Sequence, residues 1–185
     1  MTDLRHIFSA KGDHGLYLYR HKHEEALLKE AKRELARCET GAHQLKIVNV
    51  QEIDIKVIKS NEQMKFVPSG HTIYIAVPGE MTHPNAEFIL DLAMAIREAE
   101  QFLLGYTPPD LDEDPEKYSL IYHTRQLDLI VHMFKIADEL QKTEKSEVFL
   151  DKIENYGYGY LYKLYKEDVS NEELIELYLE NIDQS

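Results

Sequence analysis

Two long stretches of the sequence repeat apolar residues at the spacing of an amphipathic helix, and this feature constrains the fold most. The first stretch follows Pro84 and Asn85 and ends before Gly105, and the second runs from about Glu116 to Lys142. An apolar stripe at this spacing has to be buried, so two long helices are expected to form the core. The expected stripes are Phe88, Leu92, Ala95, Ile96, Ala99, Phe102 and Leu103 in the first helix, and Leu120, Leu127, Ile130, Val131, Phe134, Ala137 and Leu140 in the second.

The hydrophobic period changes to two before the first long helix. Ile53, Ile55 and Val57 alternate with their neighbours, which is typical of a half-buried strand. A compact run of β-branched and aromatic residues follows further along, after a turn rich in Pro, Ser and Gly. Strands are therefore expected at 53–58, 64–67 and 72–77.

Shorter helical patterns flank these elements. The sequence predicts a helix from His23 to about Cys38, and a second that begins with Thr40 as its N-cap. Three more are expected at 146–155, 158–166 and 171–181, the last capped by Ser170 or Asn171. The expected architecture is a single α+β domain over residues 1–185, with a small three-stranded sheet packed on the two long helices. The core is expected to span 20–142, and 143–185 to form a helical C-terminal extension.

The charge of the chain limits its partners. The formal net charge is −13, from 21 basic and 34 acidic residues. A nucleic-acid partner needs a basic face and an anionic membrane repels this charge, so neither is expected. The single Cys38, the lack of a signal-peptide pattern and the lack of a run of about 18 apolar residues favour a soluble, cytoplasmic protein. A stiff acidic connector among prolines is expected at Asp110, Asp112, Glu113, Asp114 and Glu116.

Two further groups are candidates for function. Asp128 and His132 are four residues apart on one helix, so they share a face and form a candidate pair for a metal or a cleft. The second group lies in a tyrosine-rich run near the C-terminus, where a ring can contact a partner or cap the core. Its members at helical spacing are Tyr158, Tyr162 and Tyr165.

The stretch 92–101 reads LAMAIREAEQ. It resembles the long helix of small bacterial zincin-like metallopeptidases of the gluzincin type, which reads approximately LAHELRHAxQ. The shared frame residues are Leu92, Ala93, Arg97, Ala99 and Gln101. The chemistry residues differ, because Met94 and Glu98 stand where the two zinc histidines would be, and Ala95 stands where the general-base glutamate would be.

The resemblance extends over about residues 25–142. In that group the second long helix carries an Arg-x-x-Glu-Ala-Asp-like run that supplies the third zinc ligand. Here Gln126 would replace the ligand glutamate, while Asp128 keeps the aspartate. Upstream, Thr40 and Gly41 resemble the entry helix, and 72–78 resembles the edge strand of the group.

This resemblance implies a zincin-like fold without its catalysis. Two histidines four residues apart on a helix hold one zinc ion, and the glutamate beside them activates the bound water. A thioether is a poor zinc ligand and an alanine cannot take a proton, so zinc is not expected as a cofactor. We therefore expect a catalytically inactive module that binds a protein or peptide, with the cleft near Met94, Glu98 and Asp128 either filled or reused.

Two alternatives remain open. The first is a metal-dependent hydrolase with a relocated site at Glu98, Asp128 and His132, with His123 as a further candidate ligand. Such a carboxylate-rich site would suit manganese, magnesium or calcium better than zinc. The second is a structural subunit of a homo-oligomer.

Overall fold

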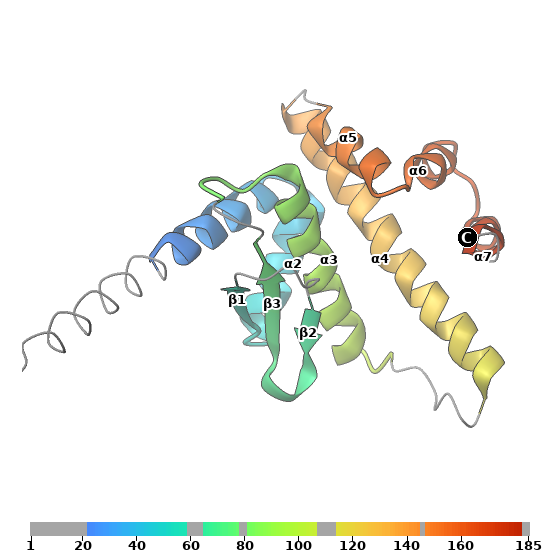
Figure 1. Ribbon diagram of the computed structural model, residues 1–185, viewed down its shortest axis with the longest axis horizontal. Helices are drawn as coiled ribbons and strands as arrows, with labels where there is room; N and C mark the ends of the chain where they lie inside the picture. Colours follow the sequence, from blue (N-terminus) through green and yellow to red (C-terminus); the bar gives the residue numbers. More distant parts are fainter. Residues whose placement is uncertain (1–21, 59–64, 78–80, 107–113, 145–146, 183–185) are drawn as a thin grey trace, which may run out of the picture.

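The computed structural model describes residues 22–58, 65–77, 81–106, 114–144 and 147–182. Over these residues the protein is mixed α+β and mostly helical, with a three-stranded sheet on one side of α3 and a long α4 on the other (Figure 1). The first described helix covers residues 22–35. Most of the acidic connector, residues 107–113, lies outside the described residues, as do residue 64 of the second expected strand and residues 78–80 after the third.

The sheet consists of β1 (Asp54–Ile58), β2 (Lys65–Val67) and β3 (Thr72–Ala76). The order is β1-β3-β2, with β1 parallel and β2 antiparallel to β3. The expectation that 72–78 forms an edge strand is therefore wrong, because β3 is the central strand. Ile73 and Ile75 are fully buried and β3 pairs on both sides, so the short β2 takes one edge of the sheet and β1 the other.

The helix α2 (Glu39–Val50) begins one residue before the expected Thr40 cap. The N-cap is Cys38, whose Sγ accepts a hydrogen bond from the backbone N–H of Gly41 at 3.3 Å. Burial raises the pKa of the Cys38 thiol to about 11, so this side chain stays protonated at neutral pH. The expectation of a Thr40 cap is wrong because the Thr40 hydroxyl bonds elsewhere, to Glu139 on α4.

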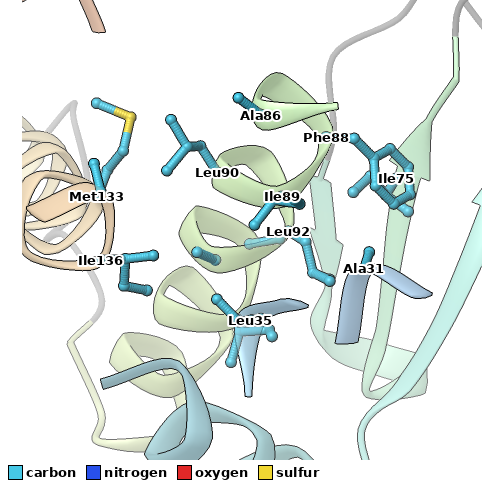
Figure 2. Close-up of a cluster of buried hydrophobic side chains, with 14 of the residues drawn as sticks. Ala31, Leu35, Ile75, Ala86, Phe88, Ile89, Leu90, Leu92, Met133 and Ile136 are labelled. Atoms are coloured by element: carbon cyan, nitrogen blue, oxygen red, sulfur yellow. The ribbon is translucent and has the colours of Figure 1, made fainter. Parts of the chain in front are cut away.

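The two long helices are α3 (Ala86–Leu103) and α4 (Pro115–Glu144), as the apolar stripes predict. The side chain of Asn85 caps α3 by accepting from the N–H of Phe88, and Gly105 takes a positive φ of 82° just beyond its end. Figure 2 shows side chains of α3 between Met133 and Ile136 on one side and Ile75 on the other. Two expected stripe residues of α4 are not among the buried core residues, since Leu120 on its first turns is 52% exposed and Val131 is only half-buried.

Three short helices follow α4 in the described part of the chain. They are α5 (Val148–Asn155), α6 (Gly159–Lys166) and α7 (Asn171–Ile182). The Oγ of Ser170 accepts from the N–H of Glu173, which confirms the expected cap of the last helix. Tyr156 connects the end of α5 to α3, because its hydroxyl donates a hydrogen bond of 2.7 Å to the carboxylate of Asp91.

Candidate functional site

A network of charged and amide side chains ties α3 to α4. The guanidinium of Arg97 donates two hydrogen bonds to Asp128, from Nε at 2.8 Å and from Nη2 at 3.0 Å. A third nitrogen of the same group, Nη1, donates to Glu100 at 2.6 Å. This planar two-point contact is the strong form of an ion pair, because both geometry and charge are matched.

Gln101 completes the network one turn further along α3. Its Nε2 donates to Asp128 at 2.6 Å and to the backbone carbonyl of Arg125 at 3.2 Å. Its Oε1 accepts from the Nε of Arg125, also at 3.2 Å. The buried amide of Gln101 therefore has partners for both of its polar atoms, and all of them lie on α4.

The network fixes the charge of its members. Burial alone would raise the pKa of Asp128, but the hydrogen bonds from Arg97 and Gln101 outweigh it and hold the pKa below its usual value. The contact with Asp128 raises the pKa of Arg97 further above its already high range. Both oxygens of Asp128 accept from Arg97 or Gln101, which makes this carboxylate a poor candidate for a metal ligand.

His132 lies one turn after Asp128, as its spacing predicts, and is half-buried. Burial, with the positive charge of Arg97 nearby, lowers the pKa of His132 to about 4, so the imidazole is neutral at pH 7. Its buried Nε2 has no hydrogen-bond partner among the described residues. The structure thus brings His132 close to the Arg97–Asp128 network, where the charges of both residues act on its imidazole.

Glu98 follows Arg97 on α3, and its side chain contacts the sheet. Its Oε2 accepts from the backbone N–H of Phe66 in β2 at 3.4 Å. Burial raises the pKa of this carboxyl, against the opposing effects of that hydrogen bond and of the charge on Arg125. Glu98 is therefore a half-buried group between α3 and an edge strand, engaged with backbone rather than with other acidic or histidine side chains.

Met94, Ala95 and Gln126 occupy the remaining positions that the resemblance singles out. Met94 and Gln126 are half-buried, and Met94 packs against the hydrophobic core. Ala95 is fully buried within that core. A carboxylate at Ala95 would be enclosed by apolar side chains, where an unpaired charge is strongly unfavourable.

The candidate metal residues do not converge. Within the described part of the chain, no group of three or more His, Cys, Asp or Glu side chains could hold a metal ion. Glu98, Asp128 and His132 therefore do not form such a group there, and neither does His123. The ring of His123 instead contacts Tyr122 and Tyr178, at centroid distances of 5.3 and 6.2 Å.

The tyrosine group lies mainly against the protein itself. The rings of Tyr162 and Tyr165 pack on Phe134 of α4, at centroid distances of 5.2 and 5.6 Å. The hydroxyl of Tyr162 donates to Asp138 at 2.6 Å, and Tyr158 packs against the core. This placement favours the alternative in which the rings cap the core, while the partner-surface prediction itself stays a prediction.

Sequence reasoning missed two polar contacts that α2 makes with the long helices. Glu139 on α4 accepts from both the N–H and the hydroxyl of Thr40. The fully buried Gln44 on α2 donates from Nε2 to the carbonyl of Ala93 at 2.8 Å. The one available signal was spacing, since Thr40 and Gln44 are four residues apart on the same face of α2.

Comparisons with protein-family models, with curated proteins and with solved structures found no match to this chain. The resemblance to zincin-like peptidases therefore stays a prediction. None of the helices in the described segments is both long and apolar enough to cross a membrane.

Proposed function

We propose that this protein is a non-catalytic interaction module, built on a zincin-like core, that binds a protein or a peptide. One observation carries the proposal. Arg97 and Gln101 are frame residues shared with the metallopeptidase helix, and both donate hydrogen bonds to Asp128. Asp128 is itself a shared residue. The positions that would hold the metal and the base have instead become Met94, Ala95, Glu98 and Gln126.

This division between kept and lost residues supports a fold retained without its chemistry. An Arg–Asp–Gln network between two core helices is useful for stability whether or not a metal is bound. A histidine pair and a general base are useful only for catalysis or metal binding. Loss of the second set with retention of the first is what a scaffold that no longer catalyses hydrolysis requires.

The charge of the chain indicates the kind of partner. With a net charge of −13, long-range attraction accelerates association with a basic protein or peptide and slows association with an acidic one. The proposed partner is therefore a basic polypeptide. Nucleic acids and anionic membranes stay outside the proposal for the same reason.

The zincin-like geometry is tested by restoring ligands. The double variant Met94→His, Glu98→His places two histidines on one face of α3, and adding Gln126→Glu supplies the third ligand from α4. If these positions face one ion, the triple variant binds zinc about 100-fold more tightly than the double variant in calorimetric titration. A matched control places the histidine pair on exposed positions of α4, as Glu116→His, Leu120→His, with the same Gln126→Glu.

In the control pair, Gln126→Glu leaves the zinc affinity unchanged. Equal zinc affinities of the double and triple motif variants would contradict the zincin-like arrangement of α3 and α4. The two alternatives have their own tests. Metal analysis of the natural chain addresses the metal-dependent hydrolase, and solution mass addresses the structural subunit.

A further inference from the structure

Helices α6 and α7 lie on the side of α4 away from α3 (Figure 1). α6 is held there by charge-assisted hydrogen bonds, because the Tyr162 hydroxyl and the Lys166 ammonium both donate to the carboxylate of Asp138, at 2.6 and 2.7 Å. The rings of Tyr162 and Tyr165 also pack on Phe134, a fully buried residue of the core. α6 is therefore firmly attached to the main body of the fold.

α7 is attached to the same face of α4 by much less burial. Leu174 is the one buried residue in 171–180, whereas α3 buries ten of its 18 residues. Leu174 and, on α4, Leu127 are buried outside the main hydrophobic cluster, and Tyr178 packs at the edge of that cluster. Because apolar burial is the main force that holds a helix in place, the closed position of α7 has only weak support.

The residue of α4 that meets Tyr178 has an unsatisfied polar atom. The rings of His123 and Tyr178 are in contact, and the Nδ1 of His123 is buried without a hydrogen-bond partner among the described residues. A buried polar atom without a partner is unfavourable, because it has lost its hydrogen bond to water. Movement of α7 away from α4 would give water access to this side chain, so the unsatisfied atom favours opening.

The outer side of α7 carries charges of one sign. Four exposed carboxylates lie on the side away from Tyr178, and they are Glu172, Glu173, Glu176 and Glu180. The segment 171–182 contains no lysine or arginine. Glu176 lies four residues from both Glu172 and Glu180, and like charges at this spacing destabilise a helix. The helix therefore opposes its own formation at the place where it is least supported by packing.

We propose that α7 is a strap that opens from α4 as a unit while α6 and the core helices stay in place, and that repulsion among its glutamates sets how often it opens. The linker 167–170 permits this movement, since all of its residues except Val169 are exposed. Opening uncovers the face of α4 that carries His123 and, one turn later, Leu127. The inference does not depend on the proposed function.

Hydrogen exchange of the natural chain, read by mass spectrometry of its peptides, measures the opening of each helix. We expect the amides of α7 to exchange about tenfold faster than those of α6, and the amides of α3 to exchange more slowly than both. Added salt slows the exchange of α7 relative to α6, since salt screens the repulsion between glutamates. Equal exchange rates in α6 and α7 would overturn the proposal, because the C-terminal helices would then open together.

Access to α4 is measured with a thiol placed beneath α7. Leu127→Cys puts a thiol at a position that is 4% exposed, and the matched control Leu140→Cys puts one at a fully buried position of the core on the same helix. Under native conditions we expect a maleimide reagent to label the thiol at 127 about tenfold faster than the thiol at 140. Equal labelling rates at the two positions would contradict independent opening of α7.

The role of charge is tested with Glu176→Lys, which turns two like-charge pairs into opposite-charge pairs. We expect this variant to slow the exchange of α7, and the labelling at 127, about threefold or more. Glu116→Lys makes the same change of charge at the exposed start of α4 and leaves both rates unchanged. Equal slowing in both variants, or no slowing in either, would overturn the proposed control by the glutamates. The exchange measurement needs no cysteine variant, so it decides the question even if Leu127→Cys folds poorly.

Discussion

The carboxylate of Glu139 on α4 accepts two hydrogen bonds from Thr40 at the start of α2, from its backbone N–H at 2.8 Å and from its hydroxyl at 2.5 Å. This contact joins residues that are 99 positions apart in the sequence. A carboxylate at a helix N-terminus satisfies a free N–H and interacts favourably with the helix dipole. It fixes the first turn of α2 on α4.

Loss of the Thr40 hydroxyl is expected to destabilise the fold. Thr40→Val keeps the shape of the side chain but leaves one oxygen of Glu139 without its donor, and we expect a loss of about 1–2 kcal/mol in the free energy of unfolding. Thr40→Ser keeps the donor and serves as the control. Urea denaturation measures both variants, and equal stabilities of the valine and serine variants would show that the hydroxyl contact contributes little.

Gly41 is expected to tolerate no side chain. A Cβ atom at this position would clash with the backbone carbonyl oxygen of Leu35 and with its side chain. Because a backbone atom cannot yield easily, Gly41→Ala should cost about 2–3 kcal/mol of stability, although alanine favours helices. Gly70→Ala is the control, since its nearest neighbour, the Oγ1 of Thr72, lies at 3.4 Å. Similar melting temperatures for the two variants would contradict the close approach of Gly41 on α2 to Leu35.

The Arg97–Asp128 contact should show a measurable coupling energy. In a double-mutant cycle with Arg97→Gln and Asp128→Asn, we expect a coupling energy of about 1–2 kcal/mol. The two hydrogen bonds between the side chains strengthen the pair, while the 41% exposure of the Asp128 side chain weakens it through solvent screening. The pair Lys56 and Asp54 on β1, with a 3.1 Å contact between exposed side chains, should show no measurable coupling. Equal coupling in both cycles would mean that the α3–α4 network is no stronger than a surface pair.

His132 should make stability dependent on pH. Its pKa is about 4 in the folded chain, and an unfolded histidine titrates near 6.5, so the unfolded state binds the extra proton first as the pH falls. Stability is therefore complete above about pH 6.5 and decreases as the pH falls from there towards 4, by on the order of 2–3 kcal/mol.

The variant His132→Gln does not titrate and should show a flatter stability curve over this interval. The charged groups that act on His132 are Arg97, Asp128, Glu100 and Lys135, all of which the variant keeps. Urea denaturation at a series of pH values gives the curves for both proteins. Parallel curves between pH 6.5 and 4 would show that His132 is not held neutral by burial.

The helices were predictable because local signals mark them. Asn85 and Gly105 delimit α3, and its apolar stripe has one helical period, so no knowledge of the tertiary structure was needed. The central place of β3 also had a signal, because 72–77 is apolar on both faces, as in a strand buried on both sides. The family resemblance led instead to the expectation of an edge.

The site was less predictable than the helices. Arg97 and Asp128 are 31 residues apart, and their contact depends on the register of α3 against α4, which periodicity does not determine. The cap of α2 is a thiol, which is not among the usual capping groups, so Thr40 was the better expectation from sequence. The exposure of Leu120 follows from the end of α3, a tertiary feature that a stripe along α4 cannot reveal.

The central claim, that the chain has the frame of a metallopeptidase without its chemistry, is tested most directly by metal content. The natural chain is dialysed with zinc and, separately, with manganese, and bound metal is measured by elemental analysis. We predict less than a stoichiometric amount of either metal. One tightly bound ion per chain, lost in the variants Glu98→Gln or His132→Gln, would contradict the account and favour a metal-dependent enzyme.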